Sequence, residues 1–114
     1  MKFLLMLTDI AGEWDRLPPA EQARILEGHA VLERELRGQK KLVGSHRLRP
    51  PDEAKTVRLP PGGGRTVTDG PFAETREVMG GYYVIDCASM EEALEWATRI
   101  PLAYGSIEVR PIWG

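Results

Sequence analysis

His29 is the residue of this sequence whose type and position most clearly suggest chemistry. Ile25, Leu32 and Leu36 recur at the spacing of one helix face, and His29 falls in the middle of that face. An imidazole taken out of water there needs a hydrogen-bond partner, and we expect a carboxylate or a backbone carbonyl. Because histidine titrates near neutral pH, a paired core histidine and a general acid or base are both open interpretations.

A forced turn around Asp69 is the second candidate. In Asp69-Gly70-Pro71 the aspartate can cap its own backbone, and the glycine is expected where a β-branched residue would be strained. A charged run then leads into Gly80-Gly81, where the backbone can approach another surface closely. Local geometry alone explains the turn. Any chemical role of Asp69 therefore depends on which residue its carboxylate contacts.

Other candidate residues favour structural roles. His46 could join His29 and Asp69 around a metal, but no short ligand spacing supports this, so no metal is predicted. The glycine run 62–64 lacks the helix and the Gly-Lys-Ser/Thr ending of a phosphate loop. Cys87 precedes a helix start that could favour a thiolate, but a small buried hydrophobe is its expected role. We expect no bound cofactor.

Length and charge narrow the class of protein. The 114 residues fit a single domain, residues 1–114. A net charge of −2, from 15 basic and 17 acidic residues, gives no general attraction to nucleic acid or to an anionic membrane. One cysteine suits a reducing compartment, and the apolar run in 2–8 is too short for a signal peptide or a membrane span. We therefore expect a cytoplasmic protein with neither nucleic-acid nor membrane partners.

The elements that must position these residues follow a β-α-β, hairpin, β-α-β order. The first helix starts at Pro18 or Pro19 and Gly38 ends it, after a loop over 9–17. Consecutive prolines at 50–51 end the second strand. The expected strands are 2–8, 41–48, 80–86 and 107–112, with a small hairpin from 56–59 and 65–68. Two split β-α-β units predict a ferredoxin-like α+β fold, an antiparallel sheet with both helices on one face.

The second helix carries a clear start signal. Ser89 and Glu92 form a capping box in which Glu92 is expected to reach back to the Ser89 amide, and Pro101 stops the helix. Its expected buried stripe is Met90, Ala93, Leu94, Ala97 and Ile100. The three tryptophans are predicted to lie in the core or in a dimer interface: Trp14, Trp96 and Trp113.

The first strand predicts a homodimer. Residues 2–8 are apolar on both faces, yet a sheet with helices on only one side leaves the other face open. A second copy packed sheet to sheet would cover it, because most oligomers are symmetric and twofold dimers are commonest.

The sequence as a whole resembles the DGPF-domain branch of the YCII-related family. The signature is 67–75, Val-Thr-Asp-Gly-Pro-Phe-Ala-Glu-Thr. Further matching segments run nearly end to end: 2–5, 27–29, 42–44, 80–83, 92–97, 99–101 and 106–111. The resemblance implies a dimeric α+β barrel. It also implies a pairing of the first-helix histidine, here His29, with an aspartate.

The position where the wider family suggests that aspartate is Ile100-Pro101 here, so Asp69 is the preferred partner of His29. Asp69, Phe72 and Tyr83 are then the candidate ligand contacts. The resemblance further implies a context linked to extracytoplasmic-function sigma factors.

Three functions stay open. The first is a small-molecule or regulatory binding domain with a cleft between the first helix, the 69–75 loop and the sheet. The second is a cofactor-independent enzyme in which His29 moves a proton and Asp69 orients the ring. The third is a protein-interaction partner, of a sigma factor for example, that needs no pocket.

Overall fold

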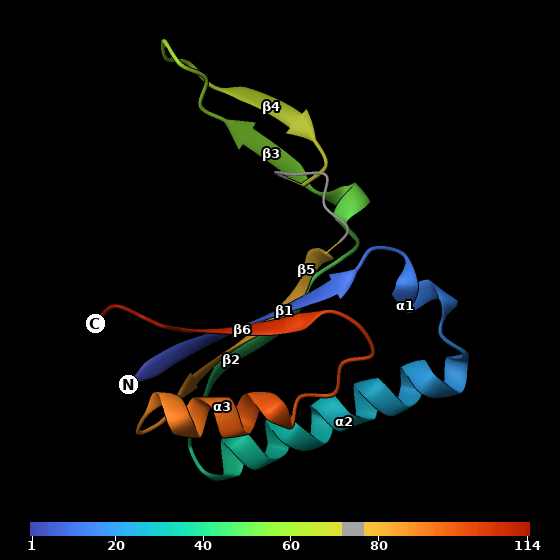
Figure 1. Ribbon diagram of the computed structural model, residues 1–114, viewed down its shortest axis with the longest axis vertical. Helices are drawn as coiled ribbons and strands as arrows, with labels where there is room; N and C mark the ends of the chain where they lie inside the picture. The colour runs from blue at the N-terminus through green and yellow to red at the C-terminus, as the bar shows by residue number, and fades with distance from the viewer. Residues whose placement is uncertain (72–76) are drawn as a thin grey trace.

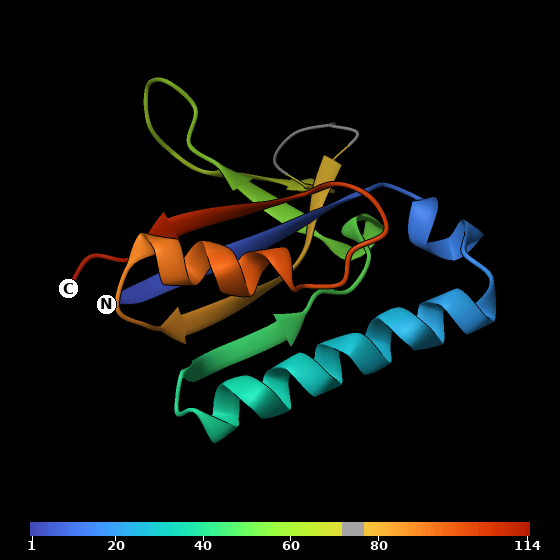
Figure 2. The ribbon, with the colours of Figure 1, turned by 60° about the horizontal axis from the view of Figure 1, so that its bottom comes forward.

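The chain forms an α+β fold built on two antiparallel sheets, consistent with the ferredoxin-like arrangement. The computed structural model describes residues 1–71 and 77–114. The larger sheet has the strand order β2-β5-β1-β6, and β3 pairs with β4 in a second sheet. Both long helices cover one face of the larger sheet (Figures 1 and 2). The elements are β1 (Lys2–Ile10), α1 (Glu13–Arg16), α2 (Pro19–Gly38), β2 (Leu42–Arg47), η1 (Pro51–Glu53), β3 (Lys55–Arg58), β4 (Thr66–Asp69), β5 (Glu77–Asp86), α3 (Met90–Thr98) and β6 (Ser106–Pro111).

The core lies between the helices and the larger sheet because side chains alternate along each strand. On β1, Phe3, Leu5 and Leu7 are buried toward the helices. From β5, Tyr83 and Ile85 join them, and both are almost fully buried. On α2 the predicted stripe Ile25, Leu32 and Leu36 is buried against the same layer. The buried stripe of the helix and the buried alternate residues of the strands therefore form one core, as the sequence indicated. No helix among the described residues is long and apolar enough to cross a membrane.

The loop differs from the sequence prediction, whereas the helix ends at Gly38 as predicted but with another residue in the left-handed conformation. The expected loop over 9–17 contains the short helix α1, and β1 continues to Ile10. The end of α2 depends on Lys40 rather than on Gly38, because Lys40 takes the left-handed conformation (φ 59°). The Lys41 amide then donates to the Leu36 carbonyl at 2.8 Å. An L residue can supply this conformation in a short turn, although glycine does so more easily.

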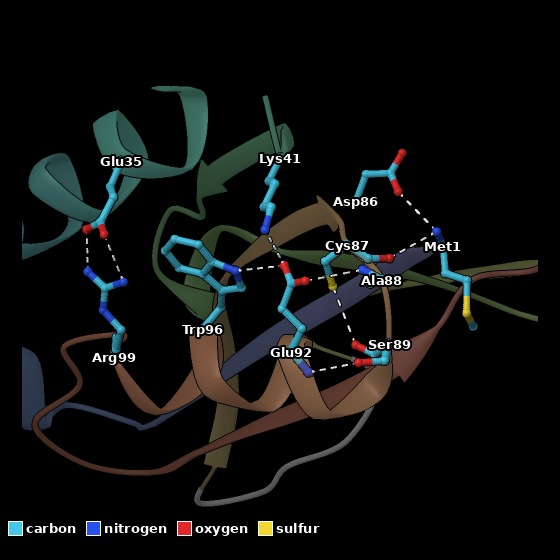
Figure 3. A network of polar contacts seen from close by, with 10 residues as sticks. All are labelled: Met1, Glu35, Lys41, Asp86, Cys87, Ala88, Ser89, Glu92, Trp96 and Arg99. Carbon is cyan, nitrogen blue, oxygen red and sulfur yellow. Dashed lines mark hydrogen bonds and ion pairs between the residues drawn. The ribbon is translucent and has the colours of Figure 1, made fainter. Parts of the chain in front are cut away.

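The cap of α3 is also slightly different. Ser89 accepts from the Glu92 amide at 3.2 Å, as expected. The Glu92 carboxylate, however, accepts from the Ala88 amide at 3.4 Å instead of from Ser89. Leu94, predicted in the buried stripe, is 48% exposed, and Trp96 is buried in its place. The actual stripe is rotated toward Trp96, whose ring lies beside Lys41 and Arg99 (Figure 3).

A polar network at this end of the molecule fastens α3 to its neighbours (Figure 3). Glu92 accepts from Lys41 at 2.6 Å and from the Trp96 indole at 3.3 Å. The Arg99 guanidinium lies 4.8 Å from the centre of the Trp96 ring and pairs with Glu35 of α2. These contacts explain Trp96 as a core residue. Of the other two tryptophans, Trp113 is fully exposed in the chain, so the core interpretation is wrong for it.

Cys87 is buried beside this network, as predicted. Burial raises the pKa of its thiol, and the thiol contacts the Ser89 carbonyl at 3.6 Å. A thiol with a raised pKa is a weak nucleophile at neutral pH. Cys87 therefore belongs to the packing of the core.

The face of the larger sheet opposite the helices is apolar at its centre. Leu4 pairs with Val84 and Met6 pairs with Tyr82 across β1 and β5, and all four side chains are only partly buried. Glu108 and Arg110 of β6 border these residues, opposite Met6 and Leu4. We call Leu4, Met6, Tyr82 and Val84 the open face. The prediction that β1 is apolar on both sides is confirmed.

The β3–β4 hairpin stands apart from the larger sheet. Figures 1 and 2 show it on the side of that sheet opposite the helices. Gly70 follows it with φ 93° and donates to the Ala54 carbonyl at 2.7 Å. This is the backbone conformation that was expected of Gly70, and a β-branched residue would be strained in it.

Candidate functional site

A cavity with a volume of about 720 Å³ lies between α2, α1, β2 and β5. Apolar side chains form most of its wall, including Ile10, Ile25, Leu26 and Leu102. His29, Glu33, Ser45 and Arg47 supply polar groups to the same wall. An apolar cleft with a few converging polar groups is the usual form of a small-molecule site.

His29 projects from the inner face of α2 and meets Tyr83 of β5. Its Nδ1 lies 2.5 Å from the Tyr83 hydroxyl, and the two rings are arranged edge to face with centroids 5.8 Å apart. Both were candidate site residues, and the structure brings them together across 54 positions of sequence. The first partner of His29 is thus a phenol instead of the expected carboxylate. A backbone hydrogen bond with Pro101 also acts on the ring, as the carbonyl alternative had anticipated.

Burial lowers the pKa of His29 from its ordinary value. The Pro101 backbone hydrogen bond and the nearby Glu33 charge act in the opposite direction, and Arg47 adds to the lowering. Desolvation is the largest of these effects, because removing water disfavours the charged imidazolium. His29 is therefore neutral at pH 7, which is the form of imidazole that can accept a proton.

Tyr83 links His29 to a second pair of polar residues. Burial and the Glu33 charge raise the pKa of Tyr83 above its usual range, so the phenol keeps its proton at neutral pH. Ser45, which lies opposite Tyr83 in the β2–β5 register, acts in the other direction. Ser45 in turn donates to Glu33 at 2.8 Å. The four residues form a chain of contacts in the order His29, Tyr83, Ser45 and Glu33, and we call it the relay.

The local structure explains why the relay assembles. His29 and Glu33 are four residues apart on α2 and so share one helix face. Ser45 lies directly opposite Tyr83 in the β2–β5 register, and its side chain points to the same side of the sheet. Glu33 and Ser45 were not among the sequence candidates. The four-residue spacing from His29 was a signal for Glu33, whereas only strand register could reveal Ser45.

Arg47 provides a cation near this cavity. Its guanidinium lies 4.8 Å from the centre of the Trp14 ring, a cation–π arrangement. Gln22 holds the Trp14 backbone by donating to its carbonyl at 2.9 Å. Trp14 thus joins α1 to the cavity wall, and the guanidinium remains close to the imidazole it influences.

The structure does not bring Asp69 to His29 within one chain. Asp69 lies at the end of β4, on the outlying hairpin, where Lys55 pairs with its carboxylate at 2.5 Å. The predicted contact between Asp69 and His29 is therefore wrong for this chain, because the turn that carries Asp69 belongs to a separate small sheet. Asp69 is also absent from the described cavity wall. Its role as a ligand contact stays a prediction.

The remaining sequence candidates are placed as follows. Phe72 lies outside the described residues. His46 is on the open-face side of β2 and contacts the ring of Tyr82, with centroids 5.7 Å apart. Within residues 1–71 and 77–114 no group of three or more His, Cys, Asp or Glu side chains is arranged to hold a metal ion.

Comparison with known proteins identifies the family. The model of the YCII-related domain matches residues 1–114. The chain belongs to the YCII-related family. An uncharacterised protein of Rhizobium meliloti (strain 1021) is 41% identical over 106 residues, which cover 90% of this chain and 82% of that protein. The family resemblance seen in the sequence is thus confirmed, whereas membership of the DGPF branch stays a prediction.

The YCII-related assignment agrees with the fold and gives no ligand. It covers the elements that carry the relay, α2, β2 and β5, because the match is end to end. The chemistry of this YCII-related domain therefore depends on the residues of its own cavity.

Proposed function

We propose that this YCII-related domain binds a small molecule with an apolar body and an acidic group in the His29 cavity. The proposal rests on the His29 imidazole, which Tyr83 holds at 2.5 Å in the wall of a mostly apolar cavity of about 720 Å³ and whose pKa burial lowers. Trp14 and Leu26 offer apolar contact to a ligand, and Arg47 offers a cation to its acidic group. This cavity volume suits a ligand of ordinary metabolite size.

A second candidate function is proton transfer within the same cavity, and the state of His29 favours it. The neutral ring can take a proton from a carbon next to a carbonyl group. Tyr83 takes over the orienting role that had been assigned to Asp69, since its hydroxyl fixes Nδ1. The relay then connects the imidazole to the Glu33 carboxylate, whose charge favours the protonated ring.

Phenylpyruvate is a suitable probe for both functions, because it combines an aromatic ring, a carboxylate and an acidic C–H bond next to a carbonyl. We expect it to shift the NMR signals of His29 and of the Trp14 indole in the wild type. His29→Leu should keep the fold and weaken this binding by roughly tenfold or more, since a polar contact is lost in a desolvated site. Arg34→Leu, an exposed position of the same helix, is the matched control.

Deuterium uptake from D₂O separates the two functions. Faster exchange of the phenylpyruvate C–H in the wild type, lost in His29→Leu, would support proton transfer. Binding without exchange would support the binding function and contradict catalysis on this class of compound. Equal binding by the wild type and His29→Leu would show that the cavity is not the site.

We also propose that the protein is a homodimer joined through the open face. The exposed surface of one chain is 7935 Å². A compact monomer of 12.7 kDa is expected to expose about 6,200 Å². A standard interface buries about 800 Å² on each partner. The difference between the exposed surface of this chain and that of a compact monomer is larger than this area, so it can accommodate such an interface. The dimeric barrel that the family resemblance implies is one form of such a dimer.

Sedimentation at micromolar concentration tests the dimer. We expect twice the chain mass for the wild type and the mass of one chain for Met6→Lys, because a charge in the middle of an apolar interface is costly. Lys2→Glu, at the start of the same strand, controls for the change of charge. A wild type at the mass of one chain would contradict the proposal.

Cytoplasmic location and the sigma-factor context stay predictions, since none of the described contacts bears on them.

A further inference from the structure

The β3–β4 hairpin is an amphipathic two-stranded ribbon. Cross-strand pairing sets Val57 opposite Val67, and it sets Lys55 opposite Asp69 on the same side. The threonines and Arg58 occupy the other side, where Arg58 donates to Thr68 at 3.3 Å. We call the side that carries Val57 and Val67 the valine face. One side of the ribbon therefore carries a valine pair next to an ion pair, and the other side carries only polar side chains.

The valine face is uncovered in the single chain. Val57 is 58% exposed and Val67 is 64% exposed, and Leu59, next along the chain, is 68% exposed. Among residues 1–71 and 77–114, the sheet that contains the ribbon has two strands. Such a ribbon is at best marginally stable in water and needs packing on another surface to be firmly ordered. Its valine face is the surface that packing would use.

The ribbon is placed beside the open face. Figures 1 and 2 show it on the side of the larger sheet away from α2 and α3, which is the side of Leu4 and Met6. It extends the molecule, whose radius of gyration is 16.1 Å against about 13 Å for a compact chain of this length. A protein docked on the open face would therefore lie alongside the ribbon.

We propose that the β3–β4 ribbon is a dimerisation arm that packs its valine face against the second copy of this chain. The inference rests on the proposed homodimer and adds a second contact to it. A second copy fits both uncovered surfaces, since a twofold axis places each arm against the partner's body in the same way. The chain exposes about 1,700 Å² more surface than a compact monomer of its mass. This is more than the roughly 800 Å² that each partner contributes to a standard interface, so the open face need not be the only contact.

The test changes the valine face and keeps the ribbon. In Val57→Lys/Val67→Glu the two new side chains stand opposite each other and can pair across the strands. Thr66→Glu/Thr68→Lys adds the same charges to the polar side, with the glutamate opposite Arg58, and is the control. The dimer dissociation constant is measured by sedimentation for the wild type and both variants. Amide exchange of β3 and β4 is followed at high and low protein concentration.

We expect the valine-face variant to weaken the dimer by at least about tenfold and the control to change it little, because buried apolar anchors dominate interfaces. Exchange in the ribbon should slow as the wild type dimerises. Equal dissociation constants for the two variants, with the wild type dimeric, would overturn the arm and leave the dimer intact. A wild type that stays a monomer would overturn the dimer and the arm together.

Discussion

A Gly105→Ala variant is expected to unfold at a markedly lower temperature than the wild type. Gly105 has φ 95°, and a Cβ placed on it would lie 2.0 Å from the Thr8 carbonyl oxygen and 3.0 Å from the Asp9 Cα. These atoms belong to the β1 backbone, which is paired with β6 at Thr8 and Ser106. Neither strand can move away without breaking this pairing. We expect a loss of roughly 3–5 kcal/mol in the free energy of unfolding.

The matched control for this clash is Gly63→Ala. Gly63 has φ 97°, almost the same conformation, but a Cβ there meets no other atom within 4 Å. Its cost is only the left-handed conformation, about 1–2 kcal/mol. Thermal or urea unfolding of both variants separates backbone strain from steric overlap. Equal losses for the two alanines would show that the close approach of Gly105 to β1 is not maintained in solution.

The second large effect is expected in the pH dependence of stability. The pKa of His29 is lower in the folded chain than in the unfolded chain, chiefly because the ring is buried. Above the unfolded pKa, about 6.5, both states hold a neutral ring and the full stability is present. As the pH falls below 6.5 the unfolded state takes up the proton first, so stability is lost until the pH reaches the folded pKa.

Removing His29 should remove this part of the pH dependence. We expect the wild type to lose more stability than His29→Gln between pH 6.5 and the lower pKa of the folded ring. NMR titration of the His29 Cε1 proton gives that pKa directly. His46→Gln is the control for the loss of a histidine. A His29 pKa above 6.5 would contradict the desolvated site on which the proposed function depends.

The sequence alone determined most of the secondary structure and the position of the core. Ile25, Leu32 and Leu36 repeat at the helix period, and that period depends only on the geometry of one segment. Both faces of β1 could be predicted in the same way, because alternation along a strand is local. Ser89 fixed the start of α3 through a cap that spans three residues. Such features depend on neighbours in sequence, so no knowledge of packing was needed.

The partner of His29 was decided only by the tertiary structure. A helical-wheel projection of α2 placed the His29 ring toward the sheet, but it could not show which strand residue would lie beneath that ring. Tyr83 reaches it because β5 is a central strand and its side chains alternate to the helix side at that point. Asp69 was the plausible acid by sequence, but its strand pairs with β3 in a separate sheet and Lys55 neutralises its charge. Strand order, register and helix placement involve residues far apart in sequence, and their outcome depends on the packing of the whole core.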